Sequence, residues 1–488
     1  RELLNKGRQL YPNQPCQTLS YGGPKLVLPQ RYLEEIRDSP DAVLAPYSLS
    51  DMPNMPGFDG FSAMNKVPSL VPDVLRVKLT QSLGLITRSL VEEGIIVTKK
   101  LFSKLAPGQW HNVQLLPKIT KIISRFTTRT ILGEEMAHNS EYVDITIYAS
   151  FSFPEALQLR RWPRYAWPII QYFHPTCQKL RYQVQKARRL ITKEIERQEK
   201  KARAVIIASK VSKTHDSVAV LEQSKTHQKL DLLGFQLAIS MLAIYNTGGV
   251  STAILVITRL LNLSHLFTAI YLITYPKYIQ LLREEAILVL REYGTRQALA
   301  HLKLQDAIHK ECLRIIRGNL TVTRRQAINR DLQFSDGFTI PKGRNFFIIP
   351  AANYLGKDEE SYPERWIRLR EREGEANKHT FVAANFDNQE FGVGKHACPG
   401  VYVSFSIFFP TSFNIDAYIH PIMRLIYRRW FANDEMKIAL CILLLRYDWK
   451  ASPGMQMPHL IACEDFPTFK ITTEVQMTPR KSEIDLAN

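Results

Sequence analysis

A single cysteine surrounded by glycines lies in the decapeptide Phe391–Gly400, FGVGKHACPG. No second cysteine is close to Cys398 in the sequence, which excludes a CxxC redox pair and half of a zinc site. The glycine spacing is not that of a phosphate-binding loop. The neighbouring Lys395 and His396, together with a helix N-terminus predicted after the loop, favour the thiolate form of the cysteine. Two interpretations stay open: a buried structural thiol, or a thiolate presented to a large ligand.

Two shorter motifs precede this loop. In the first, Glu311-x-x-Arg314, a carboxylate and a guanidinium lie three residues apart and therefore share one face of a helix. The second, Pro363–Trp366, reads Pro-Glu-Arg-Trp and adds another guanidinium, that of Arg365. Taken by itself, the first pair is also consistent with a salt bridge on the protein surface.

The order of the three motifs over residues 311–400 resembles that of the cytochromes P450, the heme-thiolate monooxygenases. The sequence looks most similar to fungal, ent-kaurene-oxidase-like members. This resemblance implies a mainly α fold with small β-sheets, the triangular helical prism of that family, as a single domain over residues 1–488. It also implies one cofactor, heme b (iron protoporphyrin IX), held between a long central helix and the cysteine loop.

Within the loop, the resemblance implies a role for each residue type. Cys398 is expected to be the axial iron ligand, and electron donation from a thiolate favours O–O bond cleavage. Phe391 is expected to pack near the sulfur. Gly392 and Gly394 would let backbone N–H groups approach and tune it. His396 corresponds to a position that binds a heme propionate in relatives.

In the resembling family the Glu-x-x-Arg pair turns inward and is joined by the arginine of the later motif, here Arg365. A buried carboxylate shared by two guanidinium groups is satisfied only when all three are present. Removal of any one of Glu311, Arg314 and Arg365 would leave a buried charge, at a cost of about 3–5 kcal/mol. Relatives have several residues between their Tyr-Pro and Pro-Glu-Arg, whereas Tyr362-Pro363 meets Glu364 directly here, so the position of Arg365 is an open question.

Two further residues correspond to heme propionate contacts of the family. Residues 73–138 show mainly helical periodicity, and Trp110 matches a helical tryptophan that binds a propionate in relatives. A tryptophan that only packs is the alternative. Gln114 stands where many relatives have an arginine. Arg325 falls near a second propionate-binding position.

The stretch Leu232–Thr258 contains no charged side chain. Asp231 precedes it and Arg259 follows it. It is long enough to span a bilayer, but its polar residues and Gly248-Gly249 favour a central buried helix. The resemblance places oxygen activation on this helix, with Asn246 and Thr247 as candidate catalytic residues. An amide cannot relay a proton as a hydroxyl does, so Asn246 predicts weaker proton delivery.

Periodicity and turn residues also predict the elements around these sites. We expect a strand in 21–29, helices in 31–39, 141–228, 275–292 and 302–316, strands and turns in 321–350, and short closing strands in 446–473.

The charge is strongly basic, with 64 Lys and Arg against 46 Asp and Glu, or +18. Such an excess favours acidic partners, nucleic acid or anionic membranes. No basic patch interleaved with aromatic residues stands out, so we expect no nucleic-acid binding. Much of the charge lies in Lys179–Lys213, which predicts a long solvated helix or, alternatively, a contact with a membrane surface.

Scattered cysteines at positions 16, 177, 312, 398, 441 and 463 form no disulfide framework and favour a reducing compartment. The first residues, RELLNKGRQLYPNQP, are neither a signal peptide nor a membrane anchor. Because the resembling eukaryotic enzymes carry an N-terminal membrane helix, we expect an anchor that this chain lacks. The expected location is the cytosolic face of the endoplasmic reticulum membrane.

Two segments interrupt the family pattern. Relatives continue from the cysteine loop into an Arg-Phe/Trp-Phe-Ala helix, which appears here only at Arg429, after the segment 401–428. Pro410 and Pro421 prevent a continuous helix through that segment. The segment 255–268 separates Ser251–Ile254 from the sequence that begins at Ala269. Without this segment the two would form one continuous stretch, as the family pattern leads us to expect. We hypothesise that both are retained introns or gene-model errors, which the mature transcript would reveal.

The resemblance implies a monooxygenase that inserts one oxygen atom from dioxygen into a small hydrophobic substrate, such as a secondary metabolite or a terpenoid-like compound. Its electrons would come from NADPH through an acidic flavoprotein, the NADPH-cytochrome reductase, which a basic face would attract. Two alternatives remain: an oxygen-independent rearrangement, to which Asn246 points, or a copy inactivated by the segment after Gly400.

Overall fold

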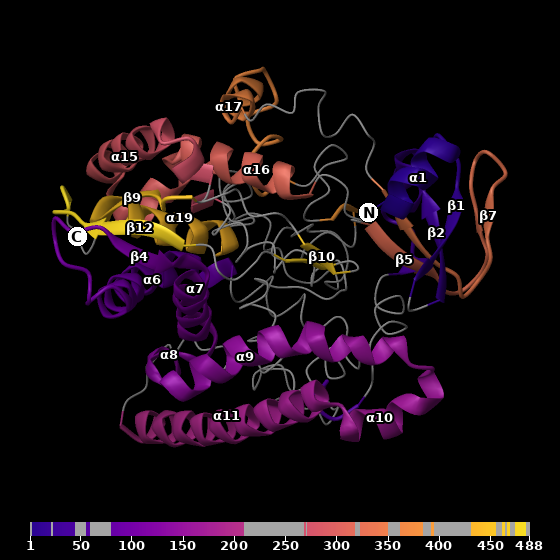
Figure 1. Cartoon of the computed structure of the whole chain (residues 1–488), viewed down its shortest axis with the longest axis horizontal. Coiled ribbons are helices and arrows are strands. Elements are labelled where there is room, and N and C mark those ends of the chain that lie inside the picture. The colour runs from indigo at the N-terminus through magenta and orange to yellow at the C-terminus, as the bar shows by residue number, and fades with distance from the viewer. Residues whose placement is uncertain are drawn as a thin grey trace.

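A computed structural model describes most of the chain, and all structural statements below concern the part it describes. Its residues are 2–20, 23–43, 55–58, 80–208, 268–269, 271–317, 323–349, 362–383, 392–394, 431–454, 461–463, 466–468 and 474–484. They form a mainly helical protein with several small sheets (Figure 1), as the sequence predicts.

The core is built around helix α19 (Phe431–Arg446, FANDEMKIALCILLLR), which is apolar on every side from Ile438 to Leu445. Such a helix has to be buried all round, and every residue from Asn433 to Leu445 is buried. Gly94 permits this packing, since a Cβ there would collide with Ile442 Cδ1 and lie 2.9 Å from Phe126 Cζ. The helices packed around α19 are α6 (Thr80–Leu101), α7 (Leu115–Leu132), α15 (Lys277–His301) and α16 (Lys303–Arg317).

A second helical layer lies below this core in Figure 1. Helix α9 packs along α11, and the short α10 joins the two at one end. Helices predicted within 141–228 are thereby confirmed as far as residue 208, and those predicted in 275–292 and 302–316 correspond to α15 and α16. The elements of the layer are α8 (Glu134–His138), α9 (Ser140–Ala156), α10 (Trp167–Phe173) and α11 (Pro175–Ala208).

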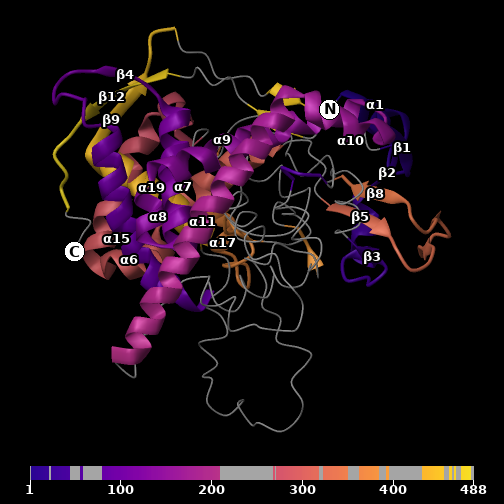
Figure 2. The ribbon, with the colours of Figure 1, turned by 90° about the horizontal axis from the view of Figure 1, so that it is seen from below.

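A five-stranded sheet occupies the opposite end of the molecule from α15 and α19 (Figures 1 and 2). Its order is β1-β2-β8-β5-β3, and only the β2–β8 pair is parallel. The strand and short helix predicted near the N-terminus are confirmed as β2 and α2 (Leu33–Ile36), and α1 (Glu2–Leu10) precedes them. The strands are β1 (Cys16–Ser20), β2 (Gly23–Leu28), β3 (Ala42–Val43), β5 (Thr323–Ala327) and β8 (Asn345–Ile348).

A three-stranded sheet joins residues 111–114, in the first quarter of the chain, to two strands near the C-terminus. Strand β4 (His111–Gln114) pairs antiparallel with β12 (Glu474–Pro479), which pairs with β9 (Tyr447–Ala451). The prediction of mainly helical structure through 73–138 is therefore wrong at residues 111–114, because backbone pairing with the distant β12 decides their conformation. Smaller elements are β6 (Leu332–Gln333) with β7 (Thr339–Ile340), β10 (Ile461–Cys463) with β11 (Phe466–Thr468), and α17 (Glu364–Arg370).

Among the described helices, none combines the length and apolar character needed to cross a bilayer. The uncharged stretch Leu232–Thr258 lies outside the described residues.

Candidate functional site

The described part of the cysteine loop is Gly392–Gly394, and both glycines have positive φ angles, 75° and 62°. At Gly394 the backbone also approaches a neighbouring turn so closely that a Cβ would collide with the Arg37 carbonyl oxygen and lie 2.7 Å from Asp38 Oδ1. Only glycine fits both constraints. The loop is thus seated against the turn that follows α2. Cys398, His396 and Phe391 lie outside the described residues.

Val393, between the two glycines, is buried and belongs to the apolar cluster that covers one face of the five-stranded sheet. Its cluster includes Leu28 of β2 and both Phe346 and Ile348 of β8. Phe346 and Ile348 are two residues apart and therefore share a face. The loop thus packs on this face of the sheet.

Arg325 lies on the same face, because it is directly opposite Phe346 in the antiparallel β5–β8 pair. Its guanidinium is buried, and Nη1 donates to the Arg324 carbonyl at 2.7 Å, while Nε has no partner among the described residues. Burial lowers the pKa of Arg325 to about 9. A buried guanidinium with no carboxylate partner in the described part of the chain fits an anionic group on a ligand.

Glu311 is the centre of a buried network on α16. Arg314 donates to it through two nitrogens, Nε to Oε2 at 2.9 Å and Nη2 to Oε1 at 2.8 Å. The backbone N–H of Tyr362 donates to Oε1 at 3.0 Å, and the indole N–H of Trp366 donates to Oε2 at 2.9 Å. The carboxylate is completely buried, and both oxygens are satisfied.

The network keeps Glu311 charged. Burial acts to raise the pKa of Glu311, but the hydrogen bonds and charge of Arg314, the Tyr362 N–H and the charge of Arg365 outweigh it, so the pKa is lowered. The alternative of a surface salt bridge is therefore wrong.

Arg365 contributes less than the sequence implies. Its Nη2 lies 3.8 Å from Glu311 Oε1, beyond hydrogen-bonding distance, and its Nε donates to the Tyr362 carbonyl at 3.0 Å. The indole N–H of the neighbouring Trp366 donates to Glu311 in place of the Arg365 guanidinium. Sequence reasoning missed this tryptophan, although the indole N–H of a buried tryptophan usually finds an acceptor.

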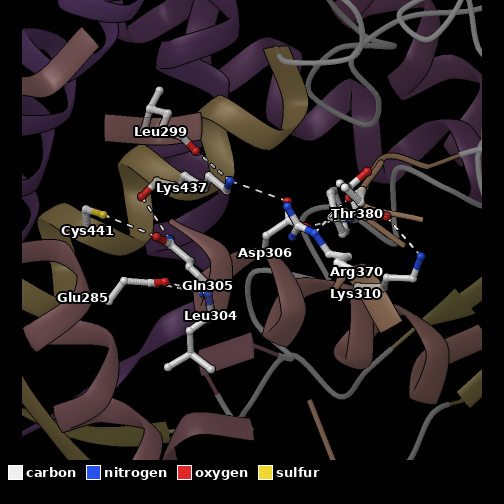
Figure 3. Close-up of polar contacts among 12 residues, drawn as sticks. Glu285, Leu299, Leu304, Gln305, Asp306, Lys310, Arg370, Thr380, Lys437 and Cys441 are labelled. Atoms are coloured by element: carbon white, nitrogen blue, oxygen red, sulfur yellow. Dashed lines mark hydrogen bonds and ion pairs between the residues drawn. The ribbon is translucent and has the colours of Figure 1, made fainter. Parts of the chain in front are cut away.

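A second buried carboxylate, Asp306, ties α16 to elements on both sides of the loop (Figure 3). Its Oδ2 accepts from the Phe381 N–H at 2.9 Å and from Arg370 Nη1 at 3.2 Å. On the other side, Lys437 Nζ of α19 lies 3.5 Å from Oδ1 and donates to the Leu299 carbonyl at 2.8 Å. Helix α19 is therefore anchored on α16.

The start of α16 is fixed by its neighbours as well. The Glu285 carboxylate of α15 accepts from the N–H groups of Leu304, at 2.6 Å, and Gln305, at 3.0 Å. These are N–H groups that a helix leaves free at its first turn. The Gln305 side chain in turn donates to the Lys437 carbonyl at 3.2 Å, and its Oε1 accepts from Cys441 Sγ at 3.4 Å. Hydrogen bonds thus fix how α15, α16 and α19 pack against one another at the start of α16.

The expectation that Trp110 lies on a helix is wrong, while its expected contact with a heme propionate stays a prediction. Trp110 precedes strand β4 instead of lying on a helix, its side chain is 42% exposed, and Lys450 Nζ lies 4.1 Å from its ring centroid. Strand β4 belongs to the sheet on the far side of the molecule from β5 (Figures 1 and 2). The structure therefore does not bring Trp110 together with Arg325. The candidate catalytic residues Asn246 and Thr247 lie outside the described residues.

Comparison with known proteins matches this geometry. The cytochrome P450 family profile matches residues 77–404. The chain is 29% identical to the cytochrome P450 monooxygenase bsc2 of Alternaria brassicicola, over 100% of this chain and 86% of that protein. It is 30% identical to the cytochrome P450 monooxygenase eqxH of Fusarium heterosporum, over 100% of this chain and 87% of that protein. The chain belongs to the cytochrome P450 family, and its class of activity is that of a monooxygenase.

Members of this family bind heme, and the described residues fit that cofactor. The guanidinium of Arg325 can pair with a propionate, and Val393 provides an apolar contact on the same face. Bound heme supplies the oxygen chemistry. The chain supplies position: Gly394 holds the loop against the Arg37 turn, while Glu311 and Asp306 keep α16 locked to the segments before and after the loop.

Proposed function

We propose that this chain is a heme-thiolate monooxygenase of the ent-kaurene-oxidase-like group that oxidises a small hydrophobic secondary metabolite or terpenoid-like substrate. The observation that carries the proposal is the buried guanidinium of Arg325, which has no carboxylate partner among the described residues and lies on the same sheet face as the apolar cluster of Val393. The relatives support it, since those found over the full chain are named monooxygenases. A largely apolar pocket is typical of enzymes for such substrates.

In this proposal the loop residues have defined roles. Cys398 would hold the heme iron through its thiolate, and Gly392 and Gly394 shape the turn before it. Phe391 shields the sulfur, and His396 joins Arg325 in holding the propionates. Asn246 and Thr247 are the candidate catalytic residues, and the amide of Asn246 can donate a hydrogen bond but cannot relay a proton. Glu311, Arg314 and Arg365 are the structural triad, with Arg365 at its edge.

The proposed partners follow from charge and family. A net charge of +18 suits an acidic flavoprotein, the NADPH-cytochrome reductase. We also propose association with the cytosolic face of the endoplasmic reticulum membrane, where such a substrate would partition.

The segment 401–428 bears directly on whether this chain is active. The family profile ends at residue 404, whereas α19 after the segment is docked on α16 through Lys437 and Asp306. Both observations support an insertion into an otherwise continuous single domain of residues 1–488. The second segment, 255–268, is described only at Thr268, which is buried. Sequencing the mature transcript across both segments tests the insertion hypothesis, and a message that contains them contradicts it.

The function is tested by expressing the chain as printed and recording the reduced, carbon monoxide-bound absorption spectrum. A strongly red-shifted Soret band is expected, and Cys398→Ser should abolish it. Folded protein without the band would point to the segment 401–428, and the same spectrum of a version lacking it decides between a damaged copy and a wrong assignment. Labelled dioxygen then separates a monooxygenase, which incorporates the label, from an oxygen-independent rearrangement.

A further inference from the structure

Asp306 on α16 contacts the chain both before and after the cysteine loop. Before the loop, its Oδ2 accepts from the Phe381 N–H at 2.9 Å and from Arg370 Nη1 at 3.2 Å. After the loop, Lys437 Nζ lies 3.5 Å from its Oδ1. In Figure 3 Asp306 lies between Lys437 and Arg370. One carboxylate therefore joins the segments that precede and follow the loop.

The segment before the loop is fixed to α16 at further points. One turn after Asp306, Lys310 Nζ donates to the Thr380 carbonyl at 3.1 Å. Phe381 is completely buried, and the centroid of its ring lies 5.8 Å from that of the His309 ring. Side chains of α16 thus define where the chain runs shortly before it enters the loop.

The segment after the loop depends more strongly on the charge of Asp306. Lys437 is 2% exposed, and its ammonium donates to the Leu299 carbonyl at 2.8 Å. A carbonyl satisfies a hydrogen bond, but a buried positive charge also needs an anion close to it. Burial raises the pKa of the nearby Glu285 and that of Asp434, the latter to about 7. Both are therefore weaker counter-charges for Lys437 than Asp306 is.

The described part of the loop leaves little room for displacement. Val393 is buried in the apolar cluster of the five-stranded sheet, and a Cβ at Gly394 would collide with the Arg37 carbonyl oxygen. Protein interiors are close-packed, so a loop seated in this way is sensitive to the positions of its two ends. A shift of α19 against α16 changes those positions.

We propose that Asp306 is a positioning residue for the cysteine loop. By holding Phe381 and Lys437 at the same time, it fixes the two ends between which the loop is seated. The proposal rests on the proposed function, because the fixed loop would present the Cys398 thiolate. Since the seating of Gly392–Gly394 can be measured without heme, the two proposals can fail separately.

The test is hydrogen exchange of the 488-residue chain, read by mass spectrometry in peptides that contain Gly392–Gly394. Asp306→Asn keeps an oxygen that can accept from the Phe381 N–H, but it removes the charge beside Lys437. Lys437→Met removes the ammonium and keeps an unbranched side chain of similar length.

Each variant should raise the exchange rate of these peptides about tenfold or more, because local opening costs less once the buried link between α16 and α19 is broken. The double variant Asp306→Asn/Lys437→Met should exchange no faster than the faster single variant, since both substitutions remove the same link. Circular dichroism verifies that the variants fold.

Glu93→Gln is the matched control. Glu93 of α6 is 2% exposed and pairs with Arg125 of α7 and with His138 of α8, whose Nε2 lies 2.9 Å from its Oε2. Its substitution also leaves a buried guanidinium without its carboxylate, so it should lower the thermal midpoint of unfolding as Asp306→Asn does. The exchange of Gly392–Gly394 should nevertheless stay that of the wild type.

The heme-loaded protein gives a second, spectroscopic measurement. In the reduced, carbon monoxide-bound state, Asp306→Asn and Lys437→Met should lose part of the strongly red-shifted Soret band to a band at shorter wavelength, because a displaced loop no longer presents Cys398 as a thiolate. Glu93→Gln should keep the wild-type proportion of the two bands.

Wild-type exchange of Gly392–Gly394 in both Asp306→Asn and Lys437→Met overturns the proposal, and so does an equal increase in Glu93→Gln. Unchanged band proportions in Asp306→Asn and Lys437→Met overturn it as well. If the wild type lacks the red-shifted band while Asp306→Asn still raises the exchange rate, the positioning role of Asp306 is supported and the proposed function is contradicted for the chain as printed.

Discussion

The helices on either side of the cysteine loop, α16 before it and α19 after it, both bury carboxylates but treat them in opposite ways. Glu311 on α16 accepts four hydrogen bonds, and its pKa is lowered. Asp434 on α19 has an Oδ1 without a partner in the described part of the chain, and burial raises its pKa to about 7 against the charge of Lys437. Burial alone therefore does not decide the charge of a carboxylate; the surrounding donors do.

The difference extends to the neighbours of Asp434. Both polar side-chain atoms of Asn433 are buried and have no partner among the described residues. Burial also raises the pKa of Glu435 well above its usual range, although Thr127 donates to it at 3.2 Å. The carboxylate of Glu311 on α16 thus has a donor for each oxygen, whereas Asn433 and Asp434 Oδ1, at the start of α19, have no partner among the described residues.

The largest expected effect is on α16, where hydrogen bonds satisfy both oxygens of Glu311. Arg314→Ala removes two of the four donors to Glu311 and leaves a buried charge, so we expect a loss of about 3–5 kcal/mol in the free energy of unfolding. Urea unfolding at pH 7 measures it. Lys303→Ala, at an exposed position on the same helix, is the control and should change little. A loss no larger than that of Lys303→Ala would contradict the inference that Arg314 keeps a buried charge on Glu311 stable.

The second effect is pH-dependent. Unfolded Asp434 ionises near its usual pKa of 3.8, but the folded protein holds the proton until about pH 7. Stability is therefore fully present below about pH 4 and is lost as the pH rises through 7. Asp434→Asn cannot ionise, so it should be more stable than the wild type at pH 8 by on the order of a few kcal/mol. The difference should vanish near pH 4 in thermal melts, and a constant difference across this range would refute the assignment.

A smaller effect is expected at Trp366. Trp366→Phe keeps the aromatic ring but removes the N–H that donates to Glu311 Oε2. The loss of a hydrogen bond to a charged group corresponds to about 1.5–3 kcal/mol. Urea unfolding again measures the loss. Trp449→Phe is the control, because the indole N–H of Trp449 donates to a neutral acceptor, the Leu443 carbonyl, at 3.3 Å. An equal loss in both variants would contradict a special contribution from the charge of Glu311.

The smallest effect is expected at Arg365, where the motif alone predicts a large one. Its guanidinium is partly exposed and stands 3.8 Å from Glu311. Arg365→Ala loses the hydrogen bond from Nε to the Tyr362 carbonyl but no hydrogen bond to Glu311, so it should cost about 0.5–1.5 kcal/mol. A double-mutant cycle with Arg314→Ala measures the coupling between the two arginines. A cost near that of Arg314→Ala would restore Arg365 as a full member of the triad.

Some of the site followed from local sequence. Glu311 and Arg314 meet because three residues of helix place two side chains on one face. Gly394 was expected to lie in a turn of the loop, and its positive φ angle is present; its close approach to the Arg37 carbonyl was not predicted. In each case the interacting atoms are close in the chain, or the residue type itself limits the backbone.

Other parts depended on contacts between distant segments. Trp110 was expected on a helix, but pairing of residues 111–114 with residues more than 350 positions later made that region a strand. The α10 sequence WPIIQYF also reads as an ordinary buried helix, and only its position at the edge of the layer shows that Ile169 and Phe173 face outward.

By itself, the sequence determined the order of the motifs, most helices and the basic charge, because these depend on residue type and on spacing over a few positions. Only the tertiary structure decided which donors reach Glu311. The Tyr362 N–H and the Trp366 indole come from 51 and 55 residues away, and Arg365, in the same short segment, stops short of hydrogen-bonding distance. Packing places a distant group to within an ångström, and at that scale one ångström separates a hydrogen bond from a screened charge.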